Sequence, residues 1–161
     1  MGPVELHVYD FDGTLYDSPR LRRDRPDWWF SAKSLAGYGA PGRDGKWILD
    51  TVVEARRSIR APWVRTALLT GRPKHREMVK VIKRMLSSAR LPFNRIQLKP
   101  LVPPGNTPKY KAEKVYEWLQ AEPSITKVVF YDDLQENLDA VEMAATLAGV
   151  KYQPVLASGV S

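Results

Sequence analysis

Short apolar runs alternate with stretches of helical periodicity along most of this chain, and that alternation constrains its fold more than any other feature. Each run has the length of a strand and is bounded by Gly, Pro or Asp. Strands that alternate with helices and short loops form a parallel sheet with helices on both faces. We therefore predict a Rossmann-like α/β fold with strands over 4–9, 64–69, 93–98, 125–131 and 150–156.

Apolar residues recur at helical spacing between these strands. Thr107 is expected to cap one helix with Pro108 in its first turn, and Gly149 is expected to end the last helix. The predicted helices cover 47–59, 74–89, 109–120 and 134–147.

The length of 161 residues suits one domain, expected over 1–161. Residues at about 15–45 hold several Pro, Gly and Arg and no regular pattern, which predicts a flap or small lid. There is no room for a larger cap domain, so we expect an open site that admits either a polymer end or a small phosphate ester.

The chain is basic, with a formal net charge of +7, and it contains no cysteine. The charge favours anionic partners, nucleic acid above all, and the absence of cysteine excludes disulfides and thiolate metal sites. No apolar run approaches the ~20 residues that span a bilayer, and no signal peptide is visible. We expect a cytoplasmic protein with no membrane contact.

Polar side chains follow three of the predicted strands at the point where each strand ends. Because ligands bind beyond the carboxyl ends of parallel strands, these side chains are expected to converge on one edge of the sheet. They are Asp10 and Asp12, Thr70 and Arg72, and Asp132 and Asp133.

Carboxylates that meet at one point repel one another unless a cation neutralises them, and a set of oxygen ligands suits Mg²⁺. One carboxylate can attack phosphorus and form an aspartyl-phosphate, while a second exchanges protons with the leaving oxygen and with water. Hydroxyls and cations are needed to hold the phosphoryl oxygens. A calcium loop starting at Asp10 is excluded, because Leu15 and Leu21 stand where Gly and Glu are required.

The motifs Asp10-Phe11-Asp12-Gly13-Thr14, Thr70-Gly71-Arg72 and Asp132-Asp133 resemble those of the haloacid dehalogenase (HAD) superfamily of phosphatases. The resemblance implies that Asp10 is the nucleophile and Asp12 the acid/base, while Thr70 and Lys111 hold the phosphoryl group. It also implies an Mg²⁺ site formed by Asp10, the backbone carbonyl of Asp12, Asp132 and, through water, Asp133. Lys109 lies on the same predicted helix as Lys111 and is the alternative lysine.

Four stretches of the chain are also similar to the HAD domain of the Swiss Army Knife RNA repair proteins, a narrower resemblance. These stretches are 68–72, 91–99, 107–111 and 131–133. The same motifs serve the 3′-phosphatase domain of polynucleotide kinase/phosphatases. This resemblance implies removal of 3′-phosphate from nucleic acid ends, alone or beside a separate kinase or ligase. A nucleotidase or other small-molecule phosphatase is the alternative, and an inactive nucleic-acid-binding domain is a third.

Several further residues are candidates to bind substrate. Thr14 and Gly71 belong to the motifs, and Arg72 either contacts substrate phosphate or braces its loop. Arg20 and Arg22 lie in the predicted flap, where they either grip a nucleic acid backbone or remain solvated. Trp28 and Trp29 either stack on bases or fasten the flap to the core.

Overall fold

A computed structural model of the protein describes residues 2–18, 29–36, 47–102 and 105–157. Within them lies one parallel sheet, in the strand order β3-β2-β1-β4-β5. Its strands are β1 (Val4–Tyr9), β2 (Val64–Pro73), β3 (Arg95–Lys99), β4 (Ile125–Asp132) and β5 (Lys151–Leu156). The predicted α/β fold is confirmed.

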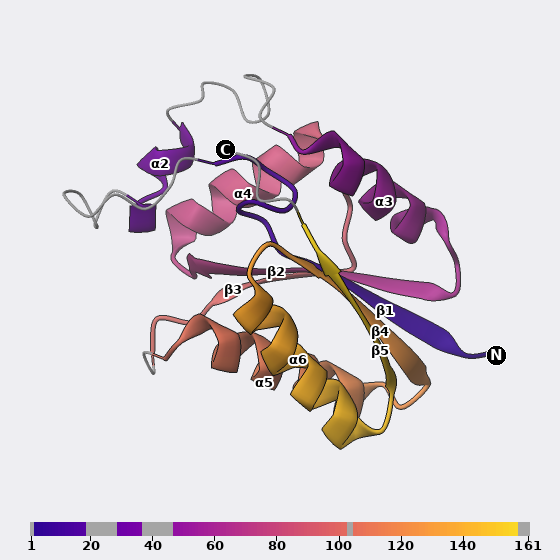
Figure 1. Ribbon diagram of the computed structural model, residues 1–161. Coiled ribbons are helices and arrows are strands. Elements are labelled where there is room, and N and C mark those ends of the chain that lie inside the picture. The colour runs from indigo at the N-terminus through magenta and orange to yellow at the C-terminus, as the bar shows by residue number, and fades with distance from the viewer. Residues whose placement is uncertain (1, 19–28, 37–46, 103–104, 158–161) are drawn as a thin grey trace.

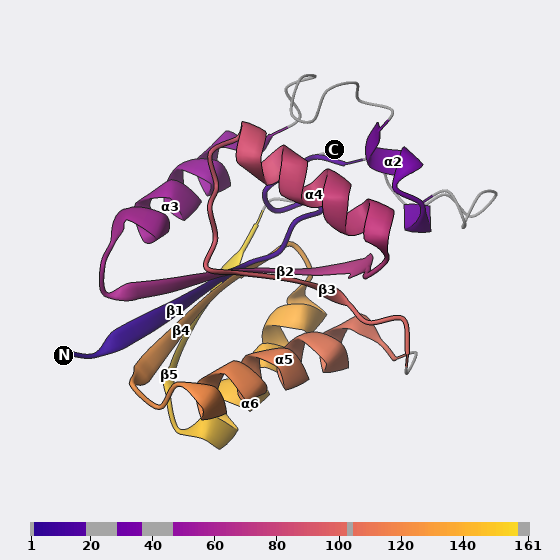
Figure 2. The same cartoon turned by 180° about the vertical axis from the view of Figure 1, so that it is seen from behind.

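Helices cover both faces of the sheet (Figure 1). Helices α3 and α4 lie on one face and α5 and α6 on the other, and the view from behind shows the same layers (Figure 2). The helices are α2 (Lys33–Ala36), α3 (Leu49–Arg60), α4 (Arg76–Ser88), α5 (Thr107–Ala121) and α6 (Gln135–Ala148).

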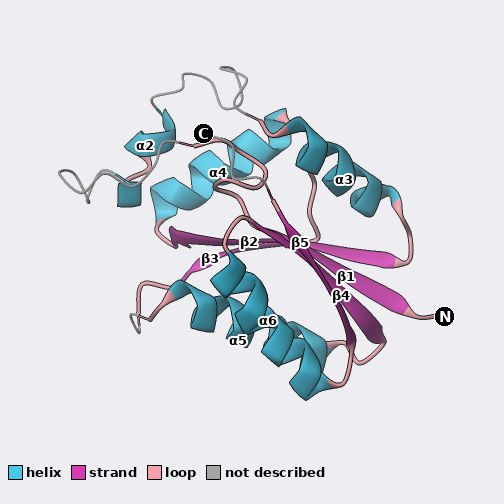
Figure 3. Ribbon diagram, in the orientation of Figure 1, coloured by secondary structure: helices cyan, strands magenta, loops and turns pink. Residues whose placement is uncertain are grey.

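The sheet is buried on both faces because alternate residues of its central strand point to opposite sides. Tyr9 of β1 belongs to the apolar cluster beneath α3 and α4. Leu6 and Val8 belong to the cluster beneath α5 and α6. His7 points to the α3 side, where its Nδ1 lies 2.6 Å from Ser58 Oγ, and its Nε2 lies 2.8 Å from Glu5 Oε1, so this half-buried side chain is held by hydrogen bonds. The sheet therefore lies between two cores, as the layered arrangement in Figure 3 shows.

Most element bounds differ from the sequence prediction by one to four residues, and two of these differences bear on the site. The side chain of Asn106, not of Thr107, caps α5 by accepting a hydrogen bond from the Lys109 N–H at 2.8 Å. Thr107 was a plausible cap by residue type, but the helix begins one residue earlier than that choice requires. Strand β2 continues past Leu69 to Pro73, so Thr70 belongs to the strand itself.

The predicted flap at about 15–45 lies largely outside the described residues. Its two flanks meet, because the Ile48 N–H donates to the Leu15 carbonyl at 2.8 Å and Tyr16 forms a β-bridge with Trp47. In the described part of the chain, no helix is both long and apolar enough to cross a membrane.

Gly149 ends α6 in the left-handed region, with φ at 71°. No atom lies within 4 Å of the position that a Cβ would take there, so a substitution at this position is destabilising only through the strain of the left-handed backbone. We expect Gly149→Ala to lower the free energy of unfolding by about 1 kcal/mol in urea titrations. Gly105→Ala is the matched control, because Gly105 has the same open surroundings without a positive φ. Equal effects of the two substitutions would contradict this account.

Candidate active site

Three neighbouring strands bring the predicted site residues to one edge of the sheet. Asp10 directly follows β1, Thr70 lies near the end of β2, and Asp132 is the last residue of β4. The strands β2, β1 and β4 are adjacent and parallel, so these carboxyl ends lie side by side. The order of the strands in the sheet therefore gathers residues that are more than 120 positions apart in the chain.

The ammonium group of Lys111 connects two of these carboxylates. It donates to Asp10 Oδ1 at 2.8 Å and to Asp132 Oδ2 at 2.7 Å. All three side chains are buried, with 1%, 7% and 0% of their surface exposed for Lys111, Asp10 and Asp132. Lys109 lies on the exposed side of α5 with Glu113 3.9 Å away, so the structure separates the two lysines that the sequence could not.

Burial and charge act in opposite directions on this group. Burial raises the pKa of Asp10 well above its usual range and the charge of Asp132 raises it further, while Lys111 opposes both. Burial by itself would lower the pKa of Lys111, but Asp10 and Asp132 outweigh it and raise that pKa. Lys111 therefore stays charged, and Asp10 depends on neighbouring positive charge to ionise.

A third carboxylate, that of Asp133, completes an acidic cluster with Asp10 and Asp132. One oxygen from each of the three lies within 4.8 Å of the others. Burial and the charge of Asp132 raise the pKa of Asp133 as well. Three ionised carboxylates against one ammonium leave an excess of two negative charges, and their oxygens are the ligands that Mg²⁺ prefers. The donor set thus fits a hard divalent cation.

Gly13 lets the Asp133 carboxylate approach the turn after β1. Its φ is +74°, and a Cβ there would lie only 2.8 Å from Asp133 Cγ. Both the left-handed conformation and the lack of a side chain are thus needed at this position. The turn also places the Thr14 hydroxyl 3.1 Å from Asp10 Oδ2, to which it donates.

Asp132 is held by residues of the helix that follows it. Its Oδ1 accepts from the Leu134 N–H at 3.0 Å and from Asn137 Nδ2 at 3.1 Å. Sequence reasoning missed Asn137. The available signal was an amide side chain next to Leu138 and Val141 on the apolar face of a predicted helix, since buried polar groups need partners.

Asp12 points away from the acidic cluster and pairs with Arg72. Arg72 donates through Nη2 to Asp12 Oδ1 at 2.7 Å and through Nε to Oδ1 and Oδ2 at 3.1 and 3.0 Å. The Ser18 hydroxyl also donates to Oδ1. The carboxylate of Asp12 is therefore not among the clustered metal-binding groups, and only its backbone carbonyl remains for that predicted role.

The same arginine holds part of the predicted flap. Its guanidinium donates through Nη1 to the Trp29 carbonyl and to Ser34 Oγ, both at 2.7 Å, and lies 4.1 Å from the centre of the Trp29 ring. Nearby, the His75 side chain caps α4 and contacts the Phe30 carbonyl at 2.9 Å. Of the two interpretations of Trp29, the structure favours the one in which it fastens the segment to the core. Trp28 lies outside the described residues.

The other predicted substrate-binding residues fall into two groups. Thr70 is buried, and its hydroxyl accepts from the Arg72 N–H at 3.1 Å. Gly71 lies against the start of α5, where a Cβ would be 3.1 Å from Thr107 Cγ2. Arg20 and Arg22 lie outside the described residues, so their proposed contacts stay predictions.

Comparison with known proteins gives a family and a fold. Residues 12–153 match a family described as HAD domain family 1 in Swiss Army Knife RNA repair proteins. The uncharacterized protein YMR265C of Saccharomyces cerevisiae is 27% identical over 166 residues, a match that covers 85% of this chain and 36% of the yeast protein. The chain thus spans little more than a third of that relative.

Among solved structures, a chain of the Pnkp1/Rnl/Hen1 RNA repair complex superposes with a TM-score of 0.61 at 17% identity, over 96% of this chain and 42% of that one. The HAD domain of the Legionella pneumophila effector protein Lem4 superposes with a TM-score of 0.62 at 12% identity, over 95% and 85%. At these identities the likeness shows the fold alone.

Replacing Lys111 should leave two buried carboxylates without their shared cation. We expect Lys111→Met to lower the free energy of unfolding by about 3 kcal/mol, measured in urea with a chelator present. Lys109→Met, two residues away on the exposed side of the same helix, should change it by less than about 0.5 kcal/mol. Comparable losses from both variants would show that the pairing with Asp10 and Asp132 contributes little.

Proposed function

Because the chain belongs to HAD domain family 1 of the Swiss Army Knife RNA repair proteins, we propose that it is a Mg²⁺-dependent phosphomonoesterase that removes 3′-phosphate from nucleic acid ends. The observation that carries the proposal is the buried group in which Lys111 joins Asp10 to Asp132. Burying two ionised carboxylates costs desolvation free energy, and packing at the edge of a sheet does not by itself require them.

Asp10 is the proposed nucleophile. Thr14 holds Oδ2 and Lys111 holds Oδ1, so the carboxylate presents a defined direction to phosphorus. Attack forms an oxygen–phosphorus bond to Asp10 and breaks the bond to the leaving oxygen. Water then displaces the phosphoryl group, which leaves as inorganic phosphate and restores the Asp10 carboxylate.

Asp12 is the proposed acid/base for both steps. Among the described residues, its Oδ1 accepts from Arg72 and Ser18, whereas Oδ2 accepts a single hydrogen bond, from Arg72 Nε. Oδ2 is therefore the oxygen left to give a proton to the leaving group and to take one from the attacking water. Arg72 is buried with its donors committed to Asp12, Trp29 and Ser34, so we assign it the positioning of Asp12 rather than direct contact with phosphate.

The phosphoryl oxygens are proposed to lie between Thr70 and the metal-binding residues. Thr70 accepts from the Arg72 N–H, so its own hydroxyl proton remains for a phosphoryl oxygen. Asp10, Asp132 and the backbone carbonyl of Asp12 would hold Mg²⁺, with Asp133 acting through water. When bound, Mg²⁺ neutralises charge on the phosphoryl oxygens and on the carboxylates around it.

Family and charge support a nucleic acid substrate. The family takes its description from RNA repair proteins, and the chain carries a net charge of +7. The likeness to a chain of the Pnkp1/Rnl/Hen1 complex supports, in addition, a separate kinase or ligase partner. A nucleotidase of the same fold would use the same site residues, so the choice of substrate has to be measured.

The decisive experiment measures phosphate release, with Mg²⁺, from a 3′-phosphorylated oligonucleotide, a 5′-phosphorylated one and a panel of nucleotides. We expect preference for the 3′-phosphorylated oligonucleotide and loss of activity on chelation. Asp10→Asn should abolish release, whereas Asp139→Asn, on the exposed face of α6, should not. Preference for a mononucleotide would make the protein a nucleotidase, and activity in Asp10→Asn would overturn the choice of nucleophile.

The role of Arg72 predicts a dependence on the leaving group. Arg72→Lys cannot keep the paired contacts to Asp12 and the bonds to Trp29 and Ser34, so proton transfer should suffer. We expect kcat/KM, which reports the first step, to fall about 100-fold for an oligonucleotide end but only a few-fold for p-nitrophenyl phosphate, whose leaving group needs no proton. Arg65→Lys, at the half-buried pair with Glu122, is the matched control. Equal losses on both substrates would rule out a role through Asp12.

A further inference from the structure

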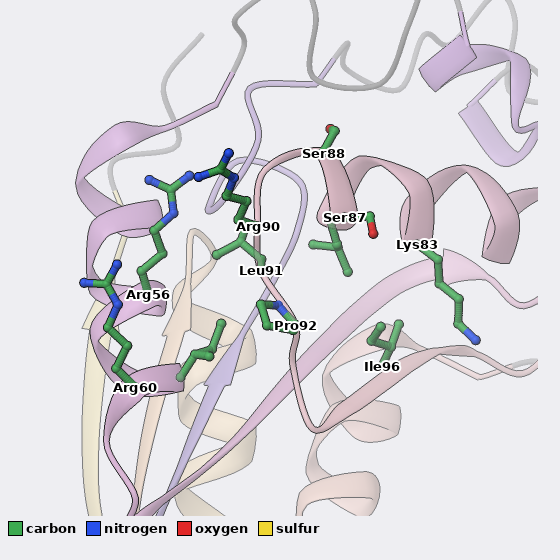
Figure 4. A pocket seen from close by; sticks show the side chains of 11 residues that line it. Arg56, Arg60, Lys83, Ser87, Ser88, Arg90, Leu91, Pro92 and Ile96 are labelled. Carbon is green, nitrogen blue, oxygen red and sulfur yellow. The ribbon is translucent and has the colours of Figure 1, made fainter.

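A pocket of about 770 Å³ lies between the C-terminal parts of α3 and α4 and the chain that leads into β3 (Figure 4). Helix α4 separates it from the catalytic edge, because α4 starts just after Arg72 and ends at the pocket. The 13 residues of α4 span about 20 Å, so the pocket belongs to a different region from the active site. Its lining is Arg56, Ile59, Arg60, Lys83, Leu86, Ser87, Ser88, Arg90, Leu91, Pro92 and Ile96.

The charge of this pocket is of one sign. Arg56, Arg60, Lys83 and Arg90 contribute to its wall, and no lining residue is acidic. In the described part of the chain, the structure pairs none of these four with a carboxylate. Four unneutralised cations around one hollow repel one another and attract an anion.

The backbone holds two of the arginines close together. Arg56 Nη2 donates to the Ala89 carbonyl at 2.7 Å, which ties α3 to the residue before Arg90. Arg90 itself has φ at 58°, the one non-glycine residue with positive φ in the described part of the chain. Figure 4 shows both guanidinium groups on the same side of the pocket. The left-handed residue ends α4, where the Leu91 N–H donates to the Leu86 carbonyl at 2.9 Å, so the helix end itself fixes the position of Arg90 beside Arg56.

The lining chemistry selects the class of ligand. Guanidinium, ammonium and hydroxyl groups all donate hydrogen bonds to phosphate oxygens. The lining has no aromatic ring to stack on a base and no amide or carboxylate to read a base edge. Its remaining side chains are aliphatic and suit the sugar. These features select a sugar–phosphate chain without regard to sequence.

We propose that this pocket binds the backbone phosphates of a nucleic acid strand whose end reaches the active site. The inference rests on the proposed function for the identity of the strand, but binding is measured separately from hydrolysis. At a duplex rise of about 3.4 Å per nucleotide, the length of α4 corresponds to about six nucleotides. Strands of that length or longer can occupy both regions, and shorter ones cannot.

The test measures the affinity of fluorescent single-stranded oligonucleotides with hydroxyl ends, so that no phosphate monoester is present. The test variant Arg60→Gln/Arg90→Asn removes two charges, and Asn tolerates the left-handed backbone at position 90. The control Lys127→Gln/Lys151→Gln removes two charges from β4 and β5, away from the pocket. Hydrolysis of p-nitrophenyl phosphate should be unchanged in both variants.

We expect the test variant to bind a 12-mer about three- to tenfold more weakly than wild type, with the slope of log K against log salt reduced by about 1.4. The control should stay within about twofold. Equal losses in test and control, or no loss in either, would overturn the inference. So would displacement of the 12-mer by a mononucleotide at a similar concentration, which would indicate a small-molecule site.

The two proposals fail differently. Binding through the pocket with no phosphate release from any nucleic acid end would support the pocket and contradict the proposed activity. Normal release from oligonucleotide ends, with the test variant binding as wild type, would support the activity and contradict the pocket.

Discussion

The contact of one buried ammonium group with two buried carboxylates is the interaction on which the rest of the site depends. Lys111 lies within 2.8 Å of Asp10 and 2.7 Å of Asp132, at the ends of adjacent strands. Charges 4 Å apart at an effective dielectric of about 20 interact by about 4 kcal/mol, so this arrangement is decided by electrostatics. It requires the N-terminal part of α5 to bring the Lys111 side chain to the carboxyl ends of β1 and β4, which ties the position of that helix to the charges at the edge.

The turn after β1 sends two carboxylates in different directions. Asp10 joins the acidic cluster, while Asp12, two residues later, turns toward Arg72 and the segment 29–36. The left-handed conformation of Gly13 and the close approach of Asp133 belong to the same turn. The two carboxylates thus have separate sets of partners, as the proposed division into nucleophile and acid/base requires.

The cationic side chains of this protein fall into two groups, one paired with carboxylates inside the molecule and one that lines a surface pocket. Lys111 and Arg72 form ion pairs with carboxylates inside the molecule. The arginines and the lysine of the pocket between α3 and α4 have no acidic partner in the described residues and face a hollow of about 770 Å³. An acidic edge that suits a divalent cation and a distant surface of unpaired cations are what the proposed activity on the end of a polyanion requires.

The sequence alone determined the fold class, the strand positions and the residues of the motifs, because burial periodicity and turn chemistry are local properties. It also predicted the family, which the match over residues 12–153 confirms. Tertiary structure alone decided that Arg72 pairs with Asp12 and that Lys111, which the family resemblance had favoured over Lys109, contacts both Asp10 and Asp132. These contacts depend on which side chains packing brings within hydrogen-bond distance across 60 residues for Arg72 and Asp12 and 101 residues for Lys111 and Asp10, and no local pattern carries that information.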